Sequence, residues 1–247
     1  MVIAIANQKG GQGKSTTAQA LATGAAKRGK KTLAIDLDPQ ANLTFSMGGN
    51  PSDVGAYELI TGQNKATQVI QRTSQGDIIA SSLALAGADT TLTGDARTIA
   101  LKQAIKPLKS KYDAIIIDCP PTLNTLLINA LAAADMVIIP LTADMYSLQG
   151  LYLLAQTIRE TKDKYNPALE IGGILFVKHS TRTILARELA EVILDTCRSL
   201  DIPAFETTIS EGVAIREAQT QRASIFDYAP KSRTAKEYMR LIEEIGL

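Results

Sequence analysis

Three glycines and two lysines are crowded into one stretch near the N-terminus, with a serine and a threonine directly after them. The stretch reads Lys9-Gly10-Gly11-Gln12-Gly13-Lys14-Ser15-Thr16. A glycine loop of this kind turns successive backbone N–H groups toward one concavity, which suits a polyphosphate. The ammonium of Lys14 could neutralise the terminal phosphates, and the hydroxyl of Ser15 could bind Mg²⁺. These residue types in this order therefore predict a polyphosphate site that binds Mg²⁺.

Three aspartates could complete such a site. Asp36 and Asp118 each end an apolar run, and Asp38 follows two residues after the first of them. Ligands of open α/β sheets collect at the carboxyl ends of the strands, so we expect these carboxylates and the glycine loop at one rim. Asp118 could hold the water shell of Mg²⁺, and Asp38 could orient or deprotonate an attacking water. Each could instead be an ordinary turn residue at the end of a strand.

The elements that must position these groups follow from the apolar pattern. Residues 2–6 form a candidate buried strand before the loop, and residues 18–27 a helix after it. Several continuous apolar runs recur between helical stretches, which is typical of a parallel sheet covered on both faces. We expect further strands at 32–36, 78–80, 114–118, 136–140, 171–177 and 204–209, and helices at 54–60, 96–108, 124–133, from about 148 to 166, and at 184–200. The predicted fold is α/β, a doubly wound, mostly parallel sheet with helices on both faces.

Length and charge limit what the chain can be. Its 247 residues suit a single α/β domain, 1–247, with no helix-turn-helix domain before the loop. With 45% hydrophobic and 21% charged residues, the composition is that of a soluble globular protein. Lys and Arg total 26 against 25 Asp and Glu, so no global basic field attracts nucleic acid. Any DNA binding must come from a local patch.

The cysteines and the apolar segments argue against a zinc protein and against a membrane-spanning protein. Cys119 and Cys197 lie far apart and the chain has one histidine, so a zinc site is not expected. The two cysteines are interpreted as reduced, buried thiols of a cytosolic protein. The most apolar segment, residues 130–141, is interrupted by Asp135 and Pro140 and is too short to span a bilayer. No targeting segment is visible, so we expect a cytoplasmic protein.

The loop departs from the ordinary phosphate-loop pattern in a way that points to one family. The first glycine of that pattern would stand five residues before Gly13, where this chain has Gln8, and an extra lysine, Lys9, stands at the mouth of the loop. In this the stretch resembles the deviant Walker A loop, K-G-G-x-G-K-[ST], of the ParA/MinD group of ATPases. The resemblance covers nearly the whole chain and is closest to small ParA or Soj-type proteins. It continues at Asp36-Leu37-Asp38-Pro39-Gln40, Asp118-Cys119-Pro120-Pro121, Arg216-Glu217-Ala218 and Tyr228-Ala229-Pro230-Lys231-Ser232.

The resemblance implies roles for the site residues. ATP with Mg²⁺ would bind in the loop at residues 9–16, with Ser15, Asp38 and Asp118 around the metal. Lys9 would reach across an ATP-dependent homodimer to the partner subunit's nucleotide, and Lys9, Lys14 and Asp38 would be catalytic. The chain departs from the family at Gln12 and in two segments that lie near the adenine in relatives, Val177-Lys178-His179 and Thr208-Ile209-Ser210.

The resemblance also implies a function. The chain would be an ATPase, weak alone and stimulated by a ParB-like partner, that binds nonspecific DNA and drives plasmid or chromosome partition on the nucleoid. Phosphate contacts need only basic side chains on one surface. The candidates are Arg182, Arg216, Arg222, Lys231 and Arg233, with Arg187, Lys236 and Arg240 nearby in the sequence. Because acidic residues are interleaved with them, the same surface could be an ordinary mixed-charge face.

Other functions remain open at this point. A MinD-like protein would use a C-terminal basic amphipathic helix as a membrane anchor, and Tyr238, Leu241, Ile242 and Ile245 do form a helical stripe. The opposite face carries Glu237, Glu243 and Glu244, which anionic lipid would repel, so we expect this helix to pack on the core. The remaining alternatives are a ParA-like ATPase that positions a protein cargo, a nucleotide switch without hydrolysis, and a dethiobiotin-synthetase-like ligase.

Overall fold

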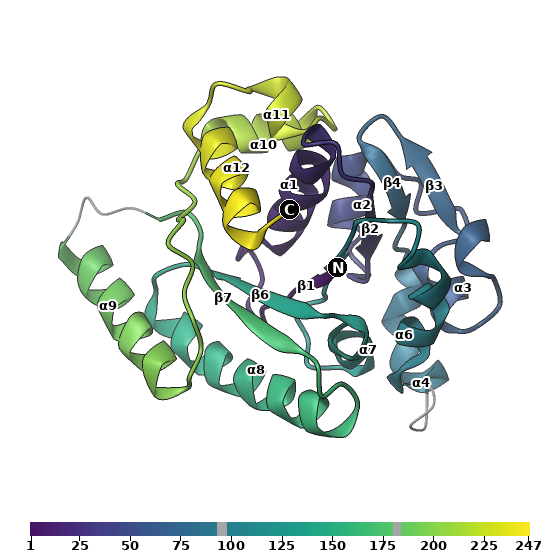
Figure 1. Ribbon diagram of the computed structural model, residues 1–247, viewed down its shortest axis with the longest axis horizontal. Coiled ribbons are helices and arrows are strands. Elements are labelled where there is room, and N and C mark those ends of the chain that lie inside the picture. The colour runs from purple at the N-terminus through teal and green to yellow at the C-terminus, as the bar shows by residue number, and fades with distance from the viewer. Residues whose placement is uncertain (93–97, 180–183) are drawn as a thin grey trace.

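A single twisted sheet forms the centre of the computed structural model, which describes residues 1–92, 98–179 and 184–247 (Figure 1). Seven strands of the described residues make up the sheet, in the order β3-β4-β2-β5-β1-β6-β7. All neighbours pair in parallel except β3 and β4, which form an antiparallel hairpin at one edge. The mostly parallel α/β fold expected from the sequence is confirmed. The strands are β1 (Val2–Ile5), β2 (Thr32–Asp36), β3 (Ile70–Thr73), β4 (Gly76–Ile79), β5 (Ala114–Asp118), β6 (Met136–Leu141) and β7 (Glu170–Phe176).

Helices cover both faces of the sheet. Helices α1, α2 and α10 to α12 lie over one face, and α3, α4 and α6 to α8 over the other, with α9 outside α8 (Figure 1). Their bounds are α1 (Lys14–Lys27), α2 (Asn42–Met47), α3 (Ala56–Ile60), α4 (Ala88–Thr91), α6 (Ala100–Ile105), α7 (Thr125–Ala133), α8 (Met145–Lys164), α9 (Ile184–Ser199), α10 (Val213–Thr220), α11 (Ile225–Tyr228) and α12 (Arg233–Ile245). Short 3₁₀ turns add η1 (Ala66–Gln68), η2 (Leu83–Gly87) and η3 (Lys106–Leu108).

Each face of the sheet has its own apolar core, because successive strand residues point to opposite sides. Along β1, Ile3 and Ile5 join the core beneath α1, whereas Val2 and Ala4 join the core beneath α7 and α8. All four are at most 1% exposed, which explains why this strand is a continuous apolar run. The central strands that carry the predicted site residues are therefore fixed from both sides.

Helix α12 packs on α1, as the sequence predicts for its apolar stripe. Tyr238, Leu241 and Ile242 are at most 1% exposed. The approach is close, since a Cβ at Gly24 of α1 would lie 2.3 Å from the Cδ1 of Ile242. No helix in the described part of the chain combines the length and the apolar character that crossing a membrane requires.

Some elements differ from the prediction. The edge strand β3 was not anticipated, because its sequence Ile-Gln-Arg-Thr is short and half-polar and, within the described part of the chain, it pairs on one side only. The strand expected at 204–209 is wrong, since this segment makes only isolated bridges, at Ala204 with β7 and at Ser210 with His179. The helix expected at 96–108 begins at Ala100 and turns to 3₁₀ before Pro107, while residues 93–97 lie outside the described part. Cys119 and Cys197 are buried free thiols, as predicted.

Candidate nucleotide site

The glycine loop joins the end of β1 to the start of α1. Gly11 and Gly13 both have φ +74°, a left-handed conformation that glycine adopts without strain. A Cβ added at Gly10 or Gly11 would meet no atom within 4 Å, so this side of the loop faces open space. Lys14 begins α1 and is only 6% exposed, at the positive end of the helix dipole. The loop thus has the backbone shape and the charge that a polyphosphate requires.

Asp118 lies in the middle of the sheet rim, beside the loop. It ends β5, between β1 and β2, and is opposite Asp36 in the strand register. It is fully buried, and among the described residues neither of its carboxylate oxygens has a hydrogen-bond partner of good geometry, although the Ser15 hydroxyl lies close enough to favour its charged form. Burial, followed by the charge of Asp36, raises its pKa well above the ordinary value, against the effects of Ser15 and Lys14. A buried carboxylate without a donor fits a bound cation, so Asp118 and Ser15 are suited to a Mg²⁺ that also contacts phosphate oxygens and water.

A magnesium ion held in this way needs few protein ligands. Among residues 1–92, 98–179 and 184–247, no three His, Cys, Asp or Glu side chains converge on a point that could hold a metal by themselves. Mg²⁺ typically binds through one or two protein oxygens together with substrate phosphates and waters. The donor set at the loop therefore fits Mg²⁺ bound with a nucleotide, and not a resident metal centre.

Asp36 and Asp38 have different environments although they are two residues apart. The carboxylate of Asp36 accepts hydrogen bonds from the Thr44 N–H at 2.8 Å, the Thr44 hydroxyl at 2.7 Å and the Asp38 N–H at 3.1 Å. Burial raises the pKa of Asp36 to about 7. Asp36 thus links α2 to the sheet, and its carboxylate oxygens already accept hydrogen bonds from within the protein. Within the described part of the chain the Asp38 carboxylate accepts one bond, from the Gln40 N–H at 3.0 Å, so it is the better placed of the two to bind a water.

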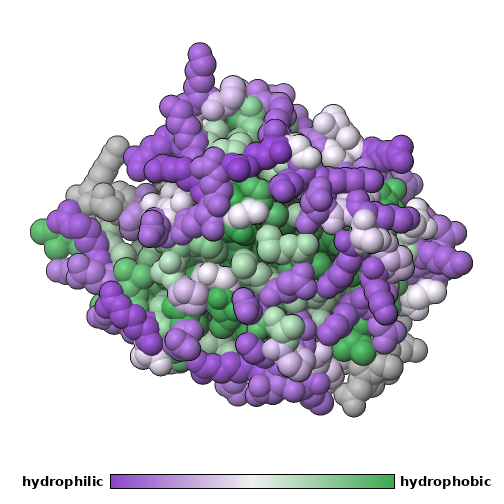
Figure 2. Space-filling view, in the orientation of Figure 1, coloured by the Kyte–Doolittle hydropathy of each residue, from purple (hydrophilic) through white to green (hydrophobic). Residues whose placement is uncertain are grey.

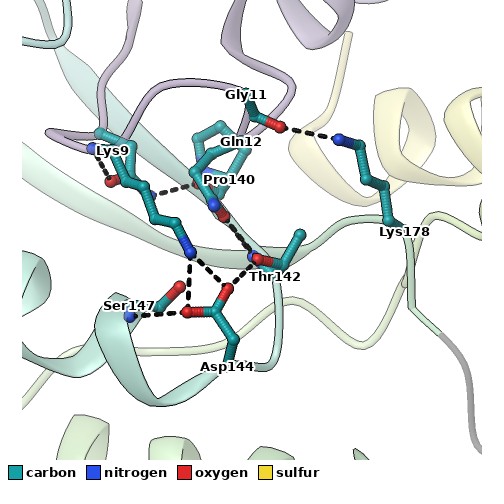
Figure 3. Close-up of polar contacts among 9 residues, drawn as sticks. Lys9, Gly11, Gln12, Pro140, Thr142, Asp144, Ser147 and Lys178 are labelled. Carbon is teal, nitrogen blue, oxygen red and sulfur yellow. Dashed lines mark hydrogen bonds and ion pairs between the residues drawn. The ribbon is translucent and has the colours of Figure 1, made fainter.

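Lys9 makes an ion pair that the sequence did not indicate. Its ammonium donates to both carboxylate oxygens of Asp144, at 2.8 and 2.7 Å (Figure 3). Asp144 is the N-cap of α8 and also accepts from the Ser147 N–H and the Thr142 hydroxyl. Although partial burial acts the other way, the bonds from Lys9 and Thr142 hold the pKa of Asp144 below its ordinary value. The only sequence signal for Asp144 was its capping position before an apolar helix.

Gln12, where the loop departs from the family pattern, attaches the loop to the connection between β6 and α8, which also carries Asp144. Its side-chain oxygen accepts from the Thr142 N–H at 2.5 Å and the Thr142 hydroxyl at 3.0 Å (Figure 3). Asn7 adds a second attachment, because its amide donates to the Pro140 carbonyl and its oxygen accepts from the Lys9 N–H. Gln12 is 3% exposed, so its side chain serves to hold the loop in place.

A cleft of about 270 Å³ opens beside the loop. Gly11, Gly13 and Thr16 line it from the loop side, and Lys178 and Ser210 from the two segments expected near the adenine. Gln219 and Tyr238 also line it, and neither was expected at the site from the sequence. The cleft continues from the glycine loop, so it is suited to hold the nucleoside while the phosphates lie in the loop.

The candidate DNA-binding residues are spread over the α10 to α12 side of the molecule. Arg216 and Arg222 lie on and just after α10, and Lys231 and Arg233 lie just before and at the start of α12. Acidic and aromatic side chains already contact three of them: Glu237 accepts from Arg233 at 2.7 Å, Glu211 lies 3.9 Å from Arg216, and the Phe45 ring lies 4.3 Å from Arg222. Figure 2 shows hydrophilic side chains over this side of the molecule. Arg182 lies outside the described residues.

Comparison with known proteins agrees with this geometry. A family model described as an AAA domain matches residues 1–171. The sporulation initiation inhibitor protein Soj of Bacillus subtilis is 37% identical over 99% of this chain and 98% of its own length. The chromosome-partitioning ATPase Soj of Treponema pallidum is 38% identical over 97% and 94%. A cobyrinic acid a,c-diamide synthase from Mycobacterium smegmatis, solved with ADP and magnesium, has a TM-score of 0.85 at 31% identity, over 98% of this chain and 92% of that one.

These relatives match the chain along nearly its whole length, so the matches span the segments that carry the loop, the aspartates and the cleft. The chain is an ATPase, and its cofactors are ATP and Mg²⁺. On sequence and fold together, it belongs to the Soj/ParA family of ATPases within the ParA/MinD superfamily.

Proposed function

We propose that the chain is a DNA-partition ATPase that dimerises with ATP, binds nonspecific DNA as the dimer, and releases it after hydrolysis stimulated by a ParB-like partner. The observation that carries this proposal is the position of Lys9. Its side chain runs away from its own loop to Asp144 on α8, half-exposed at 36% (Figure 3). A lysine in this place is available to a second subunit once it leaves Asp144.

The loop and the aspartates have separate roles in the proposed reaction. The backbone of residues 10–16 holds the polyphosphate, and Lys14 stabilises the charge that develops on it. Ser15 and Asp118 would hold the Mg²⁺, which would neutralise phosphate charge when bound. Asp38 would contribute to the metal's water shell and orient the attacking water, since its carboxylate accepts one hydrogen bond whereas that of Asp36 accepts three.

Dimer closure would exchange one partner of Lys9 for another. Within one subunit its ammonium is neutralised by Asp144. Across a face-to-face dimer it would meet the phosphates of the partner's nucleotide, which carry more negative charge than one carboxylate. The exchange would make closure depend on the triphosphate, because phosphate charge compensates for the lost ion pair.

The α12 packing favours DNA over a membrane as the surface that the dimer binds. A MinD-like anchor must release its apolar stripe, whereas Tyr238, Leu241 and Ile242 are buried against α1. Arg216, Arg222, Lys231 and Arg233 remain near the surface of the same region. We therefore propose a cytoplasmic protein associated with the nucleoid and not with the membrane.

Binding to nonspecific duplex DNA tests the proposal. Fluorescence anisotropy with ATP, ADP or no nucleotide, over a salt series, should give binding only with ATP, and the affinity should fall as salt rises. Lys14→Ala should lose nucleotide-dependent dimerisation, and Lys9→Gln should lose DNA binding. Lys162→Gln, an exposed substitution near the far end of α8, is the control and should behave as wild type. ATP-dependent dimers that ignore DNA would overturn the DNA part and favour a protein cargo.

A small-substrate ligase is the second candidate, because the Mycobacterium smegmatis relative is named a synthase. Such an enzyme uses the nucleotide within one subunit and has no need of Lys9. Phosphate release measured with wild type and Lys9→Gln separates the two. Undiminished turnover in Lys9→Gln would favour a ligase, and loss of turnover favours the dimeric ATPase.

A further inference from the structure

Besides Lys9 and Lys14 within the glycine loop, a lysine from a distant part of the chain contacts the loop. The ammonium of Lys178 donates to the carbonyl oxygen of Gly11 at 2.9 Å, across 167 residues of sequence (Figure 3). Lys178 follows β7 and lines the cleft beside the loop together with Gly13 and Thr16. It therefore lies where the phosphate loop meets the proposed nucleoside cleft.

The backbone at Lys178 is held in a conformation that a lysine adopts only at a cost. Its φ is +51°, in the left-handed region that glycine and asparagine populate far more readily. Both neighbours are fixed: the Val177 N–H donates to Leu141 at 2.9 Å, and the His179 N–H donates to Ile209 at 2.9 Å. Lys178 thus lies between a residue bonded to the end of β6 and a residue bonded to the segment at Ile209. Strained backbone positions of this kind cluster at ligand sites.

The charge of Lys178 is also uncompensated. No carboxylate of the described residues forms an ion pair with it, whereas Lys9 is neutralised by Asp144. One bond to the Gly11 carbonyl uses one of three N–H donors of the ammonium, and the flexible stem lets the head move by several ångströms. A free cation beside an anion-binding loop is suited to a phosphate oxygen.

We propose that Lys178 contacts a phosphate oxygen of the nucleotide bound in its own subunit, and that its bond to Gly11 holds the ammonium in place while the site is empty. The inference rests on the proposed placement of the nucleotide in the loop and cleft. It assigns to this chain a phosphate contact from the β7 side, in addition to Lys14 from the loop. Lys178 acts by binding and positioning, and takes no part in bond making.

Calorimetric titration tests the contact. Lys178→Gln should weaken the binding of both MgATP and MgADP by about tenfold, as for a lost charge-assisted hydrogen bond, and reduce the salt dependence of binding. Adenosine, which has no phosphate, should bind Lys178→Gln as it binds wild type. Lys178→Arg should keep most of the affinity, and Lys162→Gln should be unchanged. Equal losses for adenosine and the nucleotides, or no loss at all, would overturn the proposal.

A glycine substitution at position 178 distinguishes the effect of losing the cation from the effect of the strained backbone. Lys178→Gly relieves the left-handed conformation, so the protein should fold at least as well as wild type and still lose the nucleotide affinity. Repeating the MgADP titration in a Lys9→Gln background removes the cross-subunit lysine. A Lys178 effect that disappears there would assign the contact to the partner's nucleotide and refute the contact within one subunit. If the wild-type protein bound no MgATP, the nucleotide site and the role of Lys178 would both be wrong.

Discussion

The ammonium of Lys9 and the carboxylate of Asp144 form a two-bond ion pair within one subunit, at 2.8 and 2.7 Å. The pair joins the mouth of the glycine loop to the start of α8. Asp144 thereby holds the very lysine that the proposed dimer requires elsewhere. The strength of this pair sets how readily the lysine is released.

Asp144→Asn should make ATP-dependent dimerisation easier. Asparagine still caps α8 but loses the charge that holds Lys9. The side chains are 36% and 30% exposed, so the pair is screened and the expected shift in the dimerisation constant is about two- to fivefold. Sedimentation velocity over a range of protein concentrations with ATP measures it. Asp163→Asn, on an exposed turn of the same helix, is the control. Weaker dimerisation in Asp144→Asn would mean that Asp144 contributes to the dimer itself.

Asp38→Ala should trap the ATP-bound dimer. If Asp38 orients the attacking water, its loss slows hydrolysis by about 10²-fold or more without preventing nucleotide binding. Single-turnover hydrolysis and the lifetime of the dimer on DNA measure the two effects separately. Asp53→Ala, in an exposed loop, is the matched control. Normal partner-stimulated turnover in Asp38→Ala would remove Asp38 from the mechanism.

The buried aspartates should make the stability of the nucleotide-free protein depend on pH. Burial raises the pKa of Asp36 from 3.8 to about 7, so between these values the folded state binds a proton that the unfolded state does not. Stability should therefore fall as pH rises through this interval and level off above it. Urea unfolding at several pH values measures the slope. Asp36→Asn should reduce the slope, and Asp163→Asn should not. An unchanged slope in Asp36→Asn would show that Asp36 titrates as an exposed carboxylate does.

The parts of the site that the sequence predicted are those made by neighbouring residues. The loop, Asp38 and Asp118 stand next to apolar strands, and continuous apolar runs predict buried parallel strands. Asp144 and Lys178 meet the loop across 135 and 167 residues, and no local pattern shows which side chains will meet after folding. The half-polar edge strand β3 was missed for a related reason, because among the described strands it pairs with β4 alone.

Gln12 offers the sharpest test of how the loop is held. Methionine has nearly the same volume but accepts no strong hydrogen bond, so Gln12→Met removes both bonds to Thr142 and leaves a backbone N–H unpaired. The expected cost is about 1–3 kcal/mol of unfolding free energy, with weaker ADP binding because the loop is less ordered before binding. Gln8→Met is the control, since the Gln8 amide nitrogen is buried and already lacks a partner. Chemical unfolding and ADP titration should show a larger loss for Gln12→Met than for Gln8→Met. Equal effects would mean that the Thr142 bonds do not order the loop.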